Sequence, residues 1–323
     1  MIALLMSAAV IAAPHVTGTI PVGGAGGWDY ASFDATTRKL YIAHGSAISA
    51  VDVDAKTANP ALLVTNGAHI ALPFAGGKTL LVTNGKANNV TLNDAVTGAT
   101  TATIATDSRP DGAIIDDATG YGFVMAAGGQ VVDVVDLAKA AVVGKVAVAG
   151  KPEGAATDNN GRVFTHLEDK KGLVIIDAKA MKIVSSFTMA DCDSPSGLAY
   201  IDGKNWILSA CDNKIARVTD AATGKEIATF PIGDEPDFAL YDSARKIGYI
   251  PAGEGKLTAI SFAGNKPALI ATVPTQAGAR TAALDPKTGD VLLPTADFGP
   301  AEPGSKRPVA IPGTFRIVVV SPN

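Results

Sequence analysis

PDGAIIDDATGYGFVMAAGGQVVDVVDLAKAAVVGKVAVAGKPEG, residues 110–154, contains the pattern that decides the fold. It begins with Pro110-Asp111-Gly112 and ends with the similar motif Pro152-Glu153-Gly154. Between the two motifs lie four short runs of apolar and β-branched residues, separated by turn residues such as Asp117-Ala-Thr-Gly120. Such alternation around Asp, Thr and Gly is typical of β-hairpins. A unit of about 42 residues therefore predicts four short antiparallel strands.

This unit recurs along the chain. The middle residue of the starting motif, called the anchor here, recurs every 40 to 43 residues, at Asp29, His69, Asp111, Glu153, Ser196, Asp237 and Arg280. A second recurring residue is an Asp between the last two runs, at Asp54, Asp94, Asp136, Asp177 and Asp220. Seven such units predict an all-β chain folded as a seven-bladed β-propeller of four-stranded blades. A two-domain array of β-sandwiches is the alternative, but it requires no regular repeat.

The two ends of the chain are predicted to meet. The last unit ends with its third strand, Phe315–Val320, and lacks a fourth, whereas Val16–Val22 has the pattern of a fourth strand. We expect the N-terminal strand to complete the last blade, because this closes the ring and removes exposed edges. Residues 16–323 then form one domain. The Pro-rich insertion 299–312 is unsuited to a sheet interior and is predicted as a loop over the face that carries the anchors.

The first residues indicate export. Residues 2–13, IALLMSAAVIAA, form an uncharged apolar run that is too short for a transmembrane helix, which needs about 20 residues. The run fits the apolar part of a signal peptide, although no Lys or Arg precedes it. We therefore predict a signal peptide at residues 1–13, a periplasmic or secreted protein, and no transmembrane segment. A buried N-terminal strand is the alternative.

The two cysteines, Cys192 and Cys211, are predicted to form a disulfide. Both are expected to border the first two strands of the fifth unit, on the face that carries the anchors. Adjacent antiparallel strands are about 5 Å apart, which is within the Cα separation that a disulfide requires. An oxidising compartment would preserve the bond. Two free thiols in a cytoplasmic protein are the alternative.

Several stretches resemble a known family. Tyr41-Ile-Ala-His44-Gly45, Leu81-Val-Thr-Asn84-Gly85 and Asp220-Ala-Ala-Thr-Gly-Lys225 are similar to the repeats of the YVTN-type β-propellers of bacterial YncE-like proteins. The resemblance covers residues 16–323 and implies a seven-bladed propeller. It implies little about chemistry, because such propellers serve as binding modules, scaffolds and occasionally enzymes. A WD40 propeller is disfavoured, because Trp occurs only at positions 28 and 206.

The anchors are predicted to surround the mouth of the central channel. The first strand of a propeller unit lines the channel, so the connections that lead into these strands share one face, called the top face here. These connections carry nine acidic residues, namely Asp29, Asp107, Asp111, Glu153, Asp191, Asp193, Asp234, Glu235 and Asp237, but only the basic residues Arg109, Lys151 and Arg280. With a net charge of −4, this acidic funnel favours cations and makes nucleic acid an unlikely partner.

The candidate ligand-binding residues are Trp28, Asp29, His69, Asp111, Glu153, Asp237 and Arg280. An Asp or Glu at such a position can also be a turn residue that accepts backbone hydrogen bonds. Several acids around one channel would instead raise one another's pKa unless a cation lies between them. Trp28 and Tyr30 are expected on the opposite side of the strand from Asp29, where they either pack between blades or stack on a ligand.

A divalent cation is a possible cofactor, with His69, Asp111 and Asp29 as candidate ligands. His44 lies on the adjacent blade and could join them, and His166 could join from the fourth blade, although a single loop histidine is usually structural. The candidate catalytic residues are His44, His69, Glu153 and Arg280. Motifs of serine hydrolases, P-loops and dinucleotide-binding folds are absent from the sequence.

Three functions are compatible with these patterns. The favoured hypothesis is an exported propeller that binds a small molecule or a periplasmic protein partner on its acidic top face. The alternative is a metal-dependent hydrolase similar to a lactonase or esterase, in which a cation polarises a carbonyl, a carboxylate or His44 activates water, and Arg280 holds an anionic group. Binding of nucleic acid or polysaccharide is the third.

Overall fold

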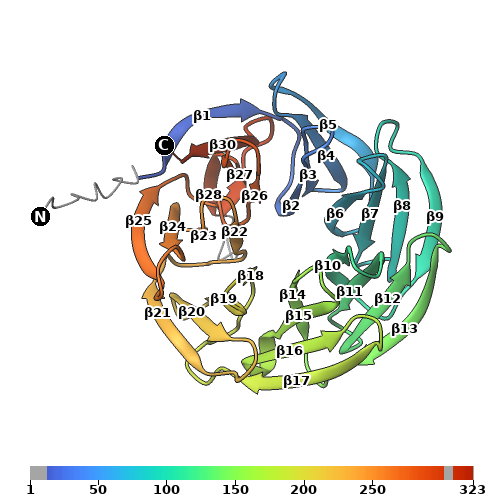
Figure 1. Ribbon diagram of the computed structural model, residues 1–323. Helices are drawn as coiled ribbons and strands as arrows, with labels where there is room; N and C mark the ends of the chain where they lie inside the picture. The colour runs from blue at the N-terminus through green and yellow to red at the C-terminus, as the bar shows by residue number, and fades with distance from the viewer. Residues whose placement is uncertain (1–12, 302–307, 323) are drawn as a thin grey trace, which may run out of the picture.

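The computed structural model describes residues 13–301 and 308–322. In this part of the chain the strands form seven four-stranded antiparallel sheets and one two-stranded hairpin. Figure 1 shows the seven sheets arranged as blades around a common axis. The chain is therefore a seven-bladed β-propeller, as the repeat predicts. Of the predicted signal peptide, residues 1–12 lie outside the described residues.

Each blade is ordered radially, from an inner strand at the axis to an outer strand on the circumference (Figure 1). The inner strands are β2 (Trp28–Asp34), β6 (Ala68–Phe74), β10 (Pro110–Asp116), β14 (Pro152–Thr157), β18 (Leu198–Ile201), β22 (Leu240–Asp242) and β26 (Ala283–Leu284). The second strands are β3 (Lys39–His44), β7 (Thr79–Asn84), β11 (Tyr121–Ala126), β15 (Arg162–Leu167), β19 (Trp206–Cys211), β23 (Ile247–Ala252) and β27 (Val291–Thr295).

The outer half of each blade has the same order. The third strands are β4 (Ala47–Asp52), β8 (Asn89–Asp94), β12 (Val131–Asp136), β16 (Gly172–Asp177), β20 (Ile215–Asp220), β24 (Lys256–Ser261) and β30 (Arg316–Ser321). The outer strands are β5 (Thr57–Val64), β9 (Thr100–Ala105), β13 (Ala141–Ala147), β17 (Lys182–Thr188), β21 (Glu226–Pro231), β25 (Ala268–Pro274) and β1 (His15–Pro21).

The core lies between the blades. The second and third strands are buried along most of their length, because each is covered by a neighbouring blade on both faces. Their sequences are accordingly near-continuous apolar runs. The outer strands have one face in solvent and are largely exposed. Seven clusters of buried apolar residues follow, each at a contact between adjacent blades.

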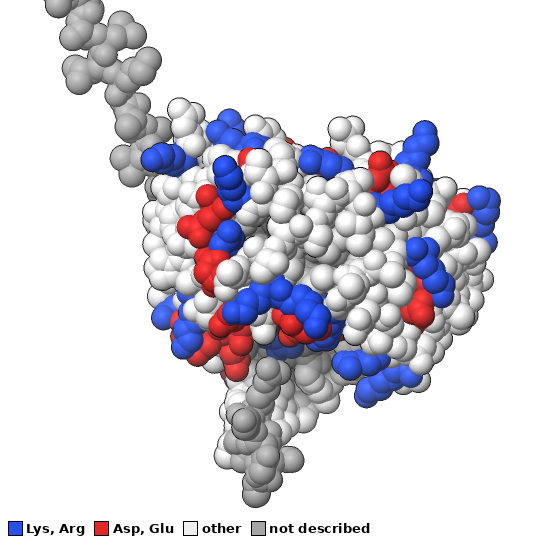
Figure 2. All heavy atoms as spheres, turned by 90° about the horizontal axis from the view of Figure 1, so that it is seen from below, with Lys and Arg blue, Asp and Glu red and all other residues white. Residues whose placement is uncertain are grey.

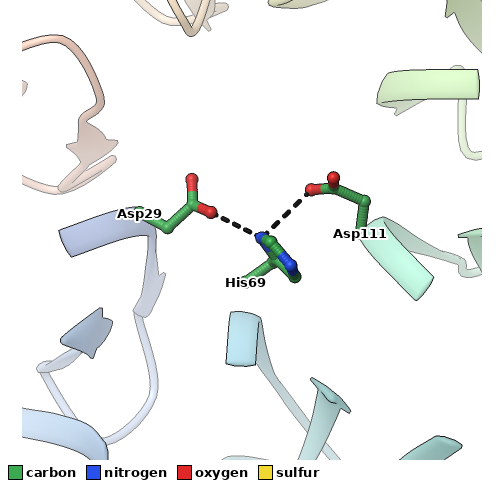
Figure 3. A group of neighbouring side chains, drawn as sticks. All are labelled: Asp29, His69 and Asp111. Atoms are coloured by element: carbon green, nitrogen blue, oxygen red, sulfur yellow. Dashed lines mark hydrogen bonds and ion pairs between the residues drawn. The ribbon is translucent and has the colours of Figure 1, made fainter. Parts of the chain in front are cut away.

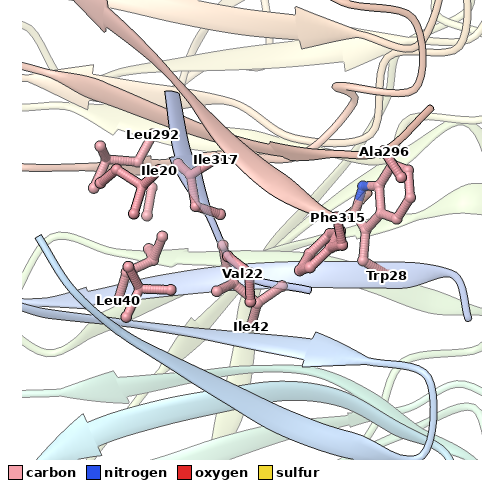
Figure 4. Packing of buried hydrophobic residues seen from close by; sticks show 12 residues of the cluster. Ile20, Val22, Trp28, Leu40, Ile42, Leu292, Ala296, Phe315 and Ile317 are labelled. Atoms are coloured by element: carbon pink, nitrogen blue, oxygen red, sulfur yellow. The ribbon is translucent and has the colours of Figure 1, made fainter. Parts of the chain in front are cut away.

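The N-terminal strand closes the ring, as predicted. Strand β1 pairs antiparallel with β30, with Ile20 opposite Ile317, so the last blade has the order β1-β30-β27-β26. Figure 4 shows Ile20 and Val22 packed between Ile317 of this blade and Ile42 of the first blade. The first and last blades are therefore joined by both a backbone ladder and an apolar cluster.

The turn residues mostly agree with the repeat. Asp94, Asp136, Asp177 and Asp220 end the third strands and accept hydrogen bonds from backbone N–H groups of the following turn. In the first blade the equivalent residue is Asp52, which accepts from the Ala55 N–H at 2.8 Å. The assignment of Asp54 to this position was wrong, because the Val-Asp-Val-Asp run offers two acids only two residues apart. Asp54 instead pairs with Arg38 at 3.0 Å.

The remaining elements lie at the top face. Cys192 and Cys211 form the predicted disulfide, with a Cα–Cα distance of 5.1 Å, and both are buried. A short 3₁₀ helix, η1 (Glu168–Lys170), connects β15 and β16. The insertion before the last strand forms the hairpin β28 (Phe298–Ala301) and β29 (Pro308–Ala310). No helix in the described residues has the length and apolar composition required to cross a bilayer.

Candidate functional site

The anchors of the first four blades all lie at β-bulges. The pairing of the inner and second strands shifts register between Trp28 and Ala31 in β2, and at the equivalent places in β6, β10 and β14. The residues inside these shifts include Asp29, His69, Asp111 and Glu153. A bulge places two residues opposite one and redirects their side chains. Four anchors at successive bulges can therefore turn toward the axis from four adjacent strands.

Three of these side chains meet at one point. His69 Nδ1 lies 2.7 Å from Asp29 Oδ2 and 3.4 Å from Asp111 Oδ1. Figure 3 shows that they come from three separate strands and point toward one another. One potential ligand atom of each lies within 4.8 Å of those of the other two, which is the arrangement that could hold a metal ion. We call this group the Asp29–His69–Asp111 cluster.

Tyr30 and Phe238 lie beneath the cluster. Their ring centroids are 5.5 Å apart, although they belong to the first and sixth blades. The Tyr30 hydroxyl donates a hydrogen bond to Glu153 Oε1 of the fourth blade at 3.4 Å. Tyr30 is buried in an apolar cluster with residues of the second and third blades, which agrees with the predicted packing between blades. Its hydroxyl also reaches the fourth blade, and its ring lines the apolar inner wall.

The acids of this site have unusual proton affinities. Burial raises the pKa of Asp111, and despite the opposing charge of His69 the pKa reaches about 6. Burial and the negative charge of Asp111 raise the pKa of Glu153 to about 8, against the opposing charge of Lys151. Burial lowers the pKa of His69, but its hydrogen bond with Asp29 and the nearby carboxylates outweigh burial and raise it. The site therefore favours added positive charge, supplied by protons or by a cation.

The last three blades contribute differently. Ser196 is buried and donates to the Pro236 carbonyl, so it is a packing residue and does not belong to the mouth. Asp237 and Arg280 form an ion pair at 2.8 Å, and Arg280 also donates to the Trp28 carbonyl. Their inner strands begin after the anchors, so these anchors lie in irregular chain. The seven anchors are therefore not equivalent, contrary to the prediction from the repeat. Those of the first four blades lie at bulges, and those of the last three blades lie in irregular chain.

Two of the other histidines lie apart from the cluster. His44 is buried, stacks on Phe315 with ring centroids 3.8 Å apart, and shares a hydrogen bond with Ser49. His166 is buried, and its two ring nitrogens contact the Ser196 carbonyl and the Ser209 hydroxyl. Burial lowers the pKa of His166 to about 4. Neither residue joins His69, because both side chains turn into the packing between blades.

The acidic rim is largely neutralised by ion pairs. Four of the five counted acids that are not anchors pair with bases: Asp107 with Lys145, Asp191 with Arg217, Asp193 with Lys171 and Asp234 with Lys214. These bases lie in or beside the third and outer strands, so a count along the connections alone missed them. Figure 2 shows, from the side, Lys and Arg close to Asp and Glu without a large area of one sign. The uncompensated acidity is therefore concentrated at the inner anchors.

A cavity of about 550 Å³ lies where the first, sixth and last blades meet, and Trp28 in its wall directly precedes Asp29 of the cluster. Trp28 and Phe298 line it and have ring centroids 5.9 Å apart. Hairpin β28–β29 forms another part of the wall through Val309 and Ala310. The insertion is thus a rim of the top face, in line with the expected position. Trp28 packs between blades, as predicted, and also lines the cavity, whereas stacking on a ligand stays a prediction.

Three residues that sequence reasoning did not assign to the site contribute to it. Tyr30 and Phe238 form the floor, and Lys151 lies 3.4 Å from Glu153 and pairs with Glu168. Lys151 adjoins a starting motif, and Phe238 stands where the third, fourth and fifth units have a glycine. The sequence thus marks both residues as unusual, but it does not show where their side chains point.

No family model matches this chain, and no curated protein matches it in sequence. Similar folds occur among solved structures. A chain of hydrazine synthase from Kuenenia stuttgartiensis has a TM-score of 0.74 at 17% identity, over 86% of this chain and 95% of that one. A chain of a mitotic checkpoint complex has a TM-score of 0.76 at 13% identity, over 99% of this chain and 98% of that one. At these identities the likeness concerns the fold alone.

Proposed function

We propose that this protein is an exported binding propeller whose top face holds a divalent cation at Asp29, His69 and Asp111, and through it a small ligand. The observation that carries the proposal is the convergence of one imidazole and two carboxylates from three adjacent blades within 4.8 Å. The raised pKa of Asp111 supports it, because a cation would relieve the repulsion between the buried acids.

The ligand chemistry narrows the choice of cation. Imidazole nitrogen suits Zn²⁺, carboxylate oxygen suits Mn²⁺, and a mixed set is compatible with both. Three protein ligands leave at least one coordination position for water or for an oxygen of a bound molecule. A purely structural site would instead be closed by a fourth protein ligand. The cluster is therefore better suited to ligand binding than to holding the fold together.

Calorimetric titration of the purified protein with Zn²⁺ and Mn²⁺ tests the proposal. We expect one equivalent to bind, and Asp111→Asn or His69→Ala to weaken binding at least about tenfold. Asp117→Asn is the matched control, because Asp117 is an exposed acid at the opposite face. Equal binding by wild-type protein and the Asp111→Asn variant would exclude the cluster as the cation site.

A second candidate function is a metal-dependent hydrolase of lactones or esters. It is supported by Glu153, whose raised pKa of about 8 would keep it protonated near neutral pH as a proton donor. A cation at the cluster would polarise a carbonyl. Metal-loaded protein should then hydrolyse simple lactones or aryl esters, and Glu153→Gln should abolish turnover without loss of the cation. Absence of turnover in the loaded protein leaves the binding function.

Export and family membership are part of the same proposal. The disulfide between Cys192 and Cys211 supports an oxidising compartment such as the periplasm. The similarity of the repeats to YVTN-type propellers supports membership of the YncE-like group. Thiol titration of denatured, unreduced protein isolated from its native compartment should find no free thiol. Two free thiols would argue for a cytoplasmic protein.

A further inference from the structure

The cavity where the first, sixth and last blades meet is adjacent to the Asp29–His69–Asp111 cluster. Trp28 lines the cavity, and the next residue, Asp29, belongs to the cluster. Arg280 also lines the cavity, and its guanidinium donates to the Trp28 carbonyl at 2.9 Å. One peptide bond, between Trp28 and Asp29, thus connects the cavity wall to the cluster.

The cavity wall is built for a flat apolar group. The rings of Trp28 and Phe298 lie on it, together with Val309, Ala310 and Pro312. The Val309 side chain is 47% exposed, so the wall presents apolar surface to solvent. Gly278 has a φ of +85°, and a Cβ there would lie 2.6 Å from Phe298, so this glycine makes room for the Phe298 ring in the wall. Aromatic walls of this kind favour ring stacking.

The size of the cavity also points to a ligand. The volume of about 550 Å³ falls in the range of small-molecule sites, roughly 300 to 1,000 Å³.

We infer that the cavity and the cluster form one site for an aromatic or similarly flat cyclic carboxylate, with the ring in the cavity and the carboxylate on the cation. This assignment rests on the proposed cation site and names its ligand class. The charged residues in the wall are Arg280 and Glu235, which are of opposite sign, so the cavity itself favours an uncharged ring. The carboxylate is then the group that occupies the open coordination position.

The probe for the test is 2-naphthoate, with Mn²⁺ as the cation. Electron paramagnetic resonance first measures Mn²⁺ binding without naphthoate. Ligand-observed NMR then measures naphthoate binding and the paramagnetic relaxation of its protons by bound Mn²⁺. Ala277→Trp fills the cavity from an exposed wall position, and Ala222→Trp makes the same change at an exposed turn outside the cavity.

We expect saturable naphthoate binding and strong Mn²⁺ relaxation in the wild-type protein and the Ala222→Trp variant. Ala277→Trp should weaken naphthoate binding at least about tenfold while Mn²⁺ binding persists. Bound Mn²⁺ with no naphthoate binding, or with binding unaffected by Ala277→Trp, overturns the assignment and leaves the proposed cation site intact. Absence of Mn²⁺ binding in the first measurement overturns the proposed function, and the coordinated carboxylate with it.

Discussion

The two ends of the inner strands carry the same kind of side chain in opposite environments. At the bottom face, Asp34, Asp116 and Asp242 end inner strands, and Asp285 directly follows one. Each is buried and accepts a hydrogen bond of 3.0 Å from a backbone N–H two or three residues later. These acids are satisfied by their own turns, which is the common structural role of Asp.

At the top face, Asp29, Asp111 and Glu153 accept no hydrogen bond from backbone N–H groups of the described residues. Their partners are side chains, most of them from other blades, and their neighbours include one another. An acid that is satisfied locally stabilises the fold, whereas acids that repel one another destabilise it unless a ligand compensates. Local backbone hydrogen bonds therefore distinguish the acids that stabilise the fold from the acids of the candidate site.

The largest expected effect is at the bottom face. Asp116 is fully buried and accepts from the Thr119 N–H, the Thr119 hydroxyl and the Thr157 hydroxyl. Asp116→Ala leaves these donors without an acceptor and should lower the free energy of unfolding by about 3 kcal/mol. Urea denaturation at pH 8 measures it. Asp111→Ala, at the other end of the same strand, should cause no loss, and an equal loss would remove the distinction between the two faces.

The next effect is stabilisation by a cation. A saturating divalent cation at 100 times its Kd should raise the free energy of unfolding by about 2.7 kcal/mol, because it binds only the folded state. Thermal unfolding with and without Zn²⁺ or Mn²⁺ measures this. Asp29→Asn should remove most of the increase, while a change at the bottom face such as Asp117→Asn should keep it. An increase that persists in Asp29→Asn would place the cation elsewhere.

Neutralising a top-face acid should stabilise the protein. The pKa of Glu153 is raised from 4.5 to about 8 in the folded state, so the folded protein disfavours its ionised form. Glu153→Gln removes that charge and should raise the free energy of unfolding at pH 8, by less than the roughly 4 kcal/mol that the full shift corresponds to, because the variant also loses the ion pair with Lys151. Urea denaturation of both proteins at pH 8 and pH 4.5 is the measurement. A destabilised variant at pH 8 would mean that the ion pair with Lys151 outweighs the repulsion.

The smallest effect is a difference in the sign of the pH dependence. The raised pKa of Glu153 contributes stability that is complete below pH 4.5 and is lost as the pH rises to about 8. Burial raises the pKa of Asp285, but hydrogen bonds from Arg38 and Thr288 outweigh it and lower the pKa below 3.8. Its contribution is therefore present above pH 3.8 and lost as the pH falls below it.

Unfolding curves between pH 2.5 and pH 8.5 separate the two contributions. Glu153→Gln should reduce the loss of unfolding free energy at alkaline pH. Asp285→Asn should reduce only the loss at acid pH. If both variants changed the same side, the acids at the two faces would not differ in the way that their hydrogen bonds indicate.

Much of the fold could be predicted because its signals are local. Each unit of about 42 residues contains its own alternation, turn acids and anchor, so the blade number, the strand order and the closure by Val16–Val22 followed from the repeat. The disulfide followed from the positions of Cys192 and Cys211 at adjacent strands. The cation candidates Asp29, His69 and Asp111 were also identified from equivalent positions, because equivalent positions in a ring face one axis.

Only the tertiary structure decided which of these residues meet. The bulge in β2 lets Tyr30 pack between blades while its hydroxyl reaches Glu153 of the fourth blade. Packing between blades sent His44 to Phe315 and away from His69. Bases of the third and outer strands neutralised the rim acids. The sequence by itself determined a seven-bladed ring with an anchor on each blade, since periodicity is local; contacts across that ring depend on register and on the distances between blades, which no single unit encodes.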